Sequence, residues 1–291
     1  MYAACRFPDS LPFVTRVAPA RGSVLPLTRA GVWLLFVLAL ANGAFLFFLP
    51  SHALTDYAWS IKPPVNAAFI GAGFLAGTLA TGLVLFGTTR WRSLQMLPPA
   101  LWVLATTLAV ATLVHHDKFK FDYPPTWGWV IVYVGVPFAI PYLVWRQRAN
   151  AEPEPPADPR LNVIRALSAV AGGVMIVGAA ALYLFPGDLA SHWVWALTPL
   201  LARATAAWYA MVGTMLVSCA LGLRRRSEAV IPYATLAAWC LLLLALPLLH
   251  ADDVDRSGGE FTAWLIVMLV LLALALLALA RSLPAVRDER L

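Results

Sequence analysis

Charge is scarce in this sequence. Of its 291 residues only 12% are charged and 61% are hydrophobic, and the mean hydropathy is +0.76. A soluble domain has about 25% charged residues, so these side chains are too few to cover a globule of this size. This composition excludes a soluble enzyme, a disordered chain and a nucleic-acid-binding module, even though the formal net charge is +6. We therefore expect lipid to be the solvent for much of the surface.

Motifs that carry chemistry are also missing. The three cysteines form no CxxC pair, and no phosphate-binding sequence such as GxxxxGKT or GxGxxG lies in a loop. The hydroxyl and thiol groups of the apolar stretches have no histidine or acid at their depth to activate them. The sequence therefore favours a role other than that of an enzyme.

What the sequence does contain is apolar stretches that are long enough, or nearly so, to cross a bilayer as helices, which takes about 20 residues. There are eight of them, at residues 31–49, 67–87, 97–114, 127–145, 166–184, 204–221, 230–249 and 261–280. None contains Asp, Glu, Lys, Arg or His, which argues against proton pumps and voltage sensors. We predict an all-α integral membrane protein with about eight transmembrane helices, in which Gly73 and Gly77 serve close packing and Pro137 and Pro141 bend the fourth helix.

The basic residues predict the orientation of these helices. If the N-terminus is cytoplasmic, 16 of the 21 Lys and Arg residues fall in inner segments and 5 in outer ones. Lys and Arg accumulate in short cytoplasmic loops, so both termini are expected in the cytoplasm of a cell that carries the protein in its plasma or inner membrane. Sorted in this way, the charge is +9 inside and −3 outside, which sums to the formal +6.

The two halves of the sequence resemble each other. Matching residues lie 136 positions apart in the pairs Trp59/Trp195, Pro63/Pro199 and Gly77/Gly213, and 135 apart in His115/His250, Asp117/Asp252 and Trp129/Trp264. With four helices in each half, the halves would be tandem parallel repeats. The expected organisation is a cytoplasmic segment (1–30), a first four-helix repeat (31–149), a Pro/Glu-rich cytoplasmic linker (150–162), a second repeat (163–281) and a cytoplasmic tail (282–291).

All five histidines fall on the predicted outer side, together with several acids. Imidazole and carboxylate are ordinary ligands of divalent metals, so His115, Asp117, His250 and Asp252 are candidate metal ligands. Other candidates on this face are His52, His116, His192, Trp59 and Trp195. The alternative is that each histidine is solvated at a helix end or bonded to a nearby acid. Haem is less favoured than a metal ion, because a haem in a bundle usually takes histidines from well inside facing helices.

Aromatic residues are also dense on the predicted outer side. We expect them to form an interfacial belt among the lipid headgroups. The loops 50–66 and 186–203 are rich in Trp and Pro, and either lie along the headgroup layer or fold over the bundle as lids.

Three functions stay open. The first is a transporter or permease for a neutral or weakly polar small molecule, which the repeats favour. The second is a structural or assembly subunit, and the third is a redox or metal- or haem-binding subunit that uses the outer histidines. The lipid bilayer is the expected partner and nucleic acid is not, while membrane protein partners and a homo-oligomer stay open.

Overall fold

The computed structural model describes residues 20–288, with side chains through Ser282. Most of the predicted N-terminal segment and the end of the predicted tail lie outside the described residues. Eight long helices make up most of the described part: α1 (Pro26–Phe48), α2 (Pro64–Gly87), α3 (Leu97–Val114), α4 (Pro124–Arg148), α5 (Asn162–Leu184), α7 (Pro199–Gly222), α8 (Val230–Leu249) and α9 (Gly259–Asp288). The short elements are η1 (Pro50–Leu54), η2 (Trp91–Ser93), η3 (His116–Lys118), η4 (Pro159–Leu161), α6 (Pro186–Leu189), η5 (Ala190–His192) and η6 (Arg226–Ala229).

Proline begins four of the long helices. Pro26, Pro64, Pro124 and Pro199 are the first residues of α1, α2, α4 and α7. The fixed φ of proline suits the first turn, and its missing N–H costs nothing there because that group has no partner within the helix. These helices therefore begin three to five residues before the apolar stretches that predict them. As a result, Arg203 belongs to α7 and not to a loop.

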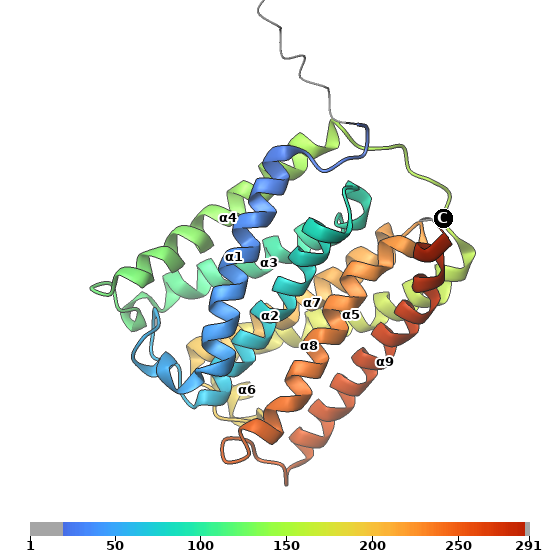
Figure 1. The fold of residues 1–291 in the computed structure, drawn as a ribbon. Helices are drawn as coiled ribbons and strands as arrows, with labels where there is room; N and C mark the ends of the chain where they lie inside the picture. Colours follow the sequence, from blue (N-terminus) through green and yellow to red (C-terminus); the bar gives the residue numbers. More distant parts are fainter. Residues whose placement is uncertain (1–19, 289–291) are drawn as a thin grey trace, which may run out of the picture.

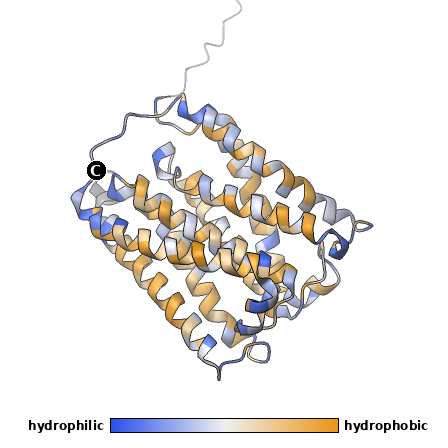
Figure 2. Ribbon diagram, turned by 180° about the vertical axis from the view of Figure 1, so that it is seen from behind, coloured by the Kyte–Doolittle hydropathy of each residue, from blue (hydrophilic) through white to orange (hydrophobic). Residues whose placement is uncertain are grey.

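The helices run back and forth between two ends of the bundle (Figure 1). We call one end the histidine end, which contains the loops 49–63, 115–123, 185–198 and 250–258. The other is the arginine end, which contains the loops 88–96, 149–161 and 223–229. Hydrophobic residues line the lengths of the helices, and hydrophilic residues gather at the ends (Figure 2). Eight helices of this length and hydropathy confirm a multi-pass membrane protein.

The helices α2, α7 and α8 form the centre of the bundle, where at least half of the residues in each apolar span are buried. Helix α1 packs on α2, α5 on α7, α4 on α3, and α9 on α8. Between the two halves of the chain, α2 packs on α8 and α7 packs on α3. The aromatic rings of Phe69, Tyr209 and Trp239 meet at this contact, with centroids 5.4–6.3 Å apart. The centre is therefore filled by side chains from both halves.

The proline pair in α4 has a partner in α3. Pro141 has no N–H, so the carbonyl of Pro137 lacks the usual hydrogen bond from four residues ahead. The indole Nε1 of Trp102 donates a hydrogen bond to this carbonyl oxygen at 3.0 Å. The tryptophan thus satisfies a backbone group that would otherwise face lipid, where an unpaired carbonyl is costly.

We expect Trp102→Phe to lower the free energy of unfolding by about 1 kcal/mol, because the phenyl ring cannot donate this bond. Unfolding in mixed micelles, followed by circular dichroism, measures the change. In a Pro141→Ala background the loss should be smaller, since the introduced alanine would supply the missing N–H. Equal losses in both backgrounds would show that Trp102 acts by packing alone.

Candidate functional site

The loops at the histidine end fold onto the bundle and bury tryptophans that were expected to form a belt. Trp59, Trp129, Trp195 and Trp264 are each at most 8% exposed. The belt prediction is wrong for these four residues, whose rings are part of the core. Trp127, at 53% exposed, keeps the position of a belt residue. Of the two expectations for the long loops, folding over the bundle is the one that this burial supports.

The buried tryptophans form one pair in each half. The rings of Trp59 and Trp129 lie 4.7 Å apart, and those of Trp195 and Trp264 lie 5.9 Å apart. The Nε1 of Trp195 donates to the Oδ1 of Asn66 at 3.0 Å, and Asn66 in turn donates to the carbonyl of Ala196. Asn66 of α2 therefore holds the loop of the second half in place.

His115 lies against a cation and not against a carboxylate. Its Nε2 is 2.6 Å from Nη1 of Arg203, so a neutral imidazole accepts a hydrogen bond from the guanidinium. Burial and the charge of Arg203 lower the pKa of His115, as does Lys118, while Asp117 raises it. The guanidinium also lies 5.9 Å from the ring centroid of Tyr183. This contact joins the end of α3 to α7 and fixes the ring nitrogen that would otherwise be free to bind a metal.

The lowered pKa of His115 predicts acid sensitivity. Its folded-state pKa lies below the ordinary 6.5, so the unfolded chain binds the proton more readily. The contribution to stability is complete above about pH 6.5 and is lost as the pH falls through the lowered pKa. His115→Gln should therefore lose less stability than the wild type between pH 7 and pH 5, when unfolding midpoints are compared. His116→Gln, one residue further on and exposed, should keep the wild-type profile.

His250 has a different partner from His115. Its Nδ1 lies 3.8 Å from Oδ2 of Asp253, and the same oxygen accepts a hydrogen bond from the main-chain N–H of Val65 at the start of α2. Burial lowers the pKa of His250, and the charge of Asp253 opposes this effect. His250 thus supports a contact between the two halves.

The other histidines and aspartates of the metal prediction either lie near other charged side chains or are exposed. Asp117 pairs with Lys118 at 2.8 Å, and His192 lies 3.9 Å from Glu260. Asp252, His52 and His116 are exposed. Within the described part of the chain no three His, Cys, Asp or Glu side chains gather in a group that could hold a metal ion. The metal or haem site therefore stays a prediction that gains no support from these contacts.

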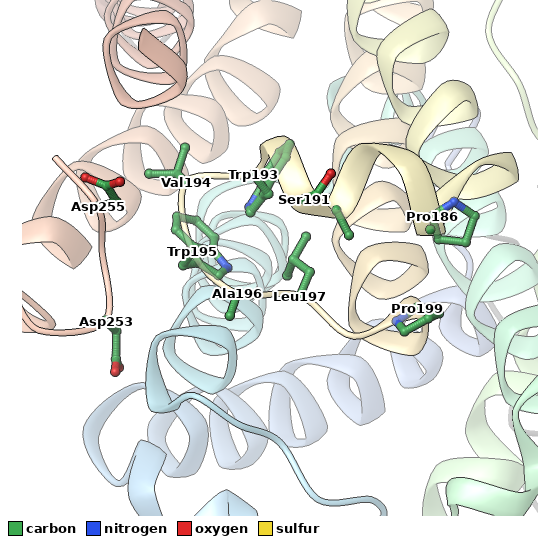
Figure 3. A pocket seen from close by; sticks show the side chains of 12 residues that line it. Pro186, Ser191, Trp193, Val194, Trp195, Ala196, Leu197, Pro199, Asp253 and Asp255 are labelled. Atoms are coloured by element: carbon green, nitrogen blue, oxygen red, sulfur yellow. The ribbon is translucent and has the colours of Figure 1, made fainter. Parts of the chain in front are cut away.

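A hollow of about 570 Å³ opens at the histidine end of the second half. Its walls are ten residues of the stretch between Pro186 and Pro199, together with Asp253 and Asp255 (Figure 3). The side chains of Trp193 and Trp195 project from the same loop, and Asp253 and Asp255 lie at the edge of the hollow. Within residues 20–288, the residues that line the hollow include two tryptophans, two prolines and two aspartates, and they include no Lys, Arg or His. Such a hollow suits a small molecule with an apolar body.

The arginine end contains a buried ion pair that was not predicted from the sequence. The Nε of Arg92 lies 2.8 Å from Oε1 of Glu228, and these side chains are 8% and 3% exposed. The second carboxylate oxygen accepts hydrogen bonds from the main-chain N–H groups of Arg224 and Arg225. The signal that could have found the pair is its spacing, since Arg92 and Glu228 are separated by the same 136 positions as Trp59 and Trp195.

The linker between the halves is bound to the arginine end by ion pairs. Its Glu154 carboxylate lies 3.0 Å from Arg224, and that of Asp158 lies 3.1 Å from Arg226. The main-chain N–H of Asp158 also donates to the carbonyl of Arg224. The ion pair of Arg92 and Glu228 is therefore surrounded by an ordered set of charges.

The candidate site thus has two parts, an open hollow at the histidine end and a closed, charged contact at the arginine end. Comparison of the chain with models of protein families, with curated proteins and with solved structures finds no match.

Proposed function

We propose that residues 31–149 and 163–281 are tandem parallel four-helix repeats joined by the linker 150–162. The support comes from two arginines 136 positions apart that make similar contacts, with acceptor residues that are 135 positions apart. Arg29 donates to the carbonyl of Leu85 near the end of α2, and Arg165 donates to that of Ala220 near the end of α7, at 2.7 and 2.8 Å. Arg29 and Arg165 are related by the same shift of 136 positions as Arg92 and Glu228.

The packing of the helices supports the same symmetry. The contacts of α1 with α2 and of α3 with α4 correspond to those of α5 with α7 and of α8 with α9. The contact of α2 with α8 likewise corresponds to that of α7 with α3. An axis along the membrane normal, passing between α2 and α7, would relate the two sets.

The proposed topology places the arginine end in the cytoplasm of a plasma or inner membrane. Its support is the distribution of Lys and Arg. A cysteine at position 225 should react with a membrane-impermeant thiol reagent only when the cytoplasmic side is opened. Labelling of Arg225→Cys from outside intact cells would overturn the topology.

We propose that the protein is a carrier for a small molecule, with the histidine end facing outward. The observation that carries this function is the difference between the two ends. The outer end has an open hollow, whereas the inner end is closed by an ion pair between corresponding positions of the two halves. A carrier needs two such ends that open in turn around a site between its repeats. The uncharged spans restrict what crosses them to neutral or weakly polar species.

Reciprocal labelling tests this function. In a background without the native cysteines, one cysteine replaces Ala196 in the hollow and another, in a separate variant, replaces the buried Ala229 beside Glu228. Glu228→Gln weakens the ion pair, so a carrier should show faster labelling of position 229 from the inner side and slower labelling of position 196 from the outer side. The matched control Arg90→Gln removes an exposed arginine and should change neither rate.

A structural or assembly subunit is the second candidate. The observation that favours it is the filled contact between the halves, where Phe69, Tyr209 and Trp239 meet and Trp239 is 1% exposed. For such a subunit the two labelling rates would not change in opposite directions when the ion pair is weakened. That result would exclude the carrier and leave the assembly role.

A further inference from the structure

The first half of the chain holds an ammonium group against two main-chain carbonyls at its histidine end. The Nζ of Lys120 donates to the carbonyl oxygens of Leu54 and Thr55, at 2.9 and 2.8 Å. The position of this lysine is fixed by its own main chain, because its N–H donates to the carbonyl of Ala58 at 2.9 Å.

The corresponding place in the second half is the hollow. The shift of 136 positions carries Leu54 and Thr55 onto Ala190 and Ser191, which both line the hollow. The shift of 135 positions, which applies to the later part of each half, carries Lys120 onto Asp255, which lines it as well.

The backbone supports this alignment independently of the side chains. The N–H of Asp255 donates to the carbonyl of Val194 at 3.2 Å. Val194 corresponds, at the shift of 136 positions, to Ala58, the residue that accepts the same bond from Lys120. The two main chains are therefore held in the same register, and the side chain at the corresponding position is an acid in place of a lysine.

Asp255 in place of a lysine reverses the charge at this position, and its shorter side chain leaves open the place that Lys120 fills in the first half. A carboxylate cannot donate a hydrogen bond to carbonyl oxygens, whereas an ammonium from outside the chain can. The Oδ1 of Asp255 accepts bonds from Ser257, and the carboxylate remains exposed. Trp193 and Trp195 also line the hollow, and aromatic rings attract a cation that approaches their faces. In the part of the chain that the structure describes, no basic side chain lines the hollow to oppose this attraction.

We propose that the hollow binds the ammonium group of a small primary amine with an apolar body, in the place that Lys120 Nζ takes in the first half. The ammonium has three N–H donors, which suit the carbonyl oxygens of Ala190 and Ser191 and the carboxylate of Asp255. The apolar body lies against Trp193 and Leu197. The proposal concerns binding at the outer end and rests on the proposed carrier function for the transport step alone. In that step the uncharged spans would pass the amine in its neutral form, after the ammonium has given a proton to water.

Binding to the full chain in phosphatidylcholine nanodiscs tests the proposal. Isothermal titration calorimetry compares n-butylammonium with butan-1-ol, which lacks the charge, and with butyltrimethylammonium, which lacks the N–H donors. We expect the primary amine to bind at least about tenfold more tightly than either, because each comparator lacks one of its two contributions, the charge or the N–H donors. Equal affinities for the three compounds, or no saturable binding of n-butylammonium, would overturn the site.

Substitutions at position 255 locate the binding. Asp255→Lys should abolish it by filling the hollow as Lys120 does in the first half. Asp188→Lys makes the same change of charge on an exposed residue that does not line the hollow, and should leave the affinity within about twofold. Asp255→Asn keeps an oxygen for Ser257 and should weaken binding about tenfold through the lost charge. Equal effects at positions 188 and 255 would show non-specific attraction and overturn the proposal.

The two proposals can fail separately. Amine binding without reciprocal labelling would refute the carrier and keep the site, whereas reciprocal labelling without amine binding would refute the site and keep the carrier.

Discussion

Replacing Arg92 by methionine is expected to lower the free energy of unfolding by about 3 kcal/mol or more. The substitution leaves the Glu228 carboxylate buried without its counterion, and breaking a buried pair from one side typically has this cost. Unfolding in mixed micelles, followed by tryptophan fluorescence, measures the change. The exposed neighbour Arg90 provides the control, since Arg90→Met removes the same charge from a solvated position.

A second substitution separates the charge from the packing. Glu228→Gln in the Arg92→Met background removes the unpaired charge but keeps an oxygen that can accept from the main-chain N–H groups of Arg224 and Arg225. The double variant should therefore be more stable than Arg92→Met alone. If it is less stable, the cost of the first substitution does not come from the unpaired carboxylate.

Gly71→Ala is expected to have the next largest effect, about 2 kcal/mol or more of lost stability. A Cβ at this position would lie 2.5 Å from the main-chain nitrogen of Phe47 and 2.9 Å from the carbonyl carbon of Leu46. Both neighbours are backbone atoms of α1, which cannot rotate away, so the two helices would have to separate. Small residues allow such close contacts in membranes, where van der Waals packing drives helix association.

Gly77→Ala in the same helix is the matched control. A Cβ at Gly77 meets no heavy atom within 4 Å, so the substitution should be neutral or slightly stabilising through helix propensity. Gly73 lies between these cases, because its Cβ would meet the ring of Trp208 at 2.5 Å. Equal losses at positions 71 and 77 would show that helix flexibility, not the contact with α1, explains the effect. Of the two glycines whose spacing predicts close packing, Gly73 makes a close contact and Gly77 does not.

The eight long helices could be predicted because each one depends on a local property of the chain. A run of apolar residues spans lipid whatever its neighbours are, and the boundaries are visible at Pro26, Pro64 and Pro199 once proline is treated as a first helical residue. Arg203 lies just before the apolar run that predicts α7, so hydropathy alone places it in a loop, whereas the helix begins at Pro199.

The site depends on contacts that no local pattern contains. Trp59 and Trp195 are buried because their loops fold onto the end of the bundle. A tryptophan of an interfacial belt lies in the same kind of sequence, so the sequence does not distinguish the two cases. The partner of His115 is Arg203, 88 residues further along, so the neighbouring Asp117 was a misleading guide to its surroundings. The ion pair of Arg92 and Glu228 was within reach, since the shift of 136 positions that aligns the tryptophans also aligns these opposite charges.

The contact of α2 with α8 has a consequence for biosynthesis. During synthesis the first half enters the membrane before α8 has been made. The face of α2 that packs on α8 is therefore exposed to lipid until then. Two polar side chains of the first half also lack their partners at this stage, because Asn66 bonds to Trp195 and Arg92 pairs with Glu228, which both belong to the second half. The bundle therefore closes late, when most of the chain has been translated, and a chain that ends after the linker would leave Asn66 and Arg92 without these partners.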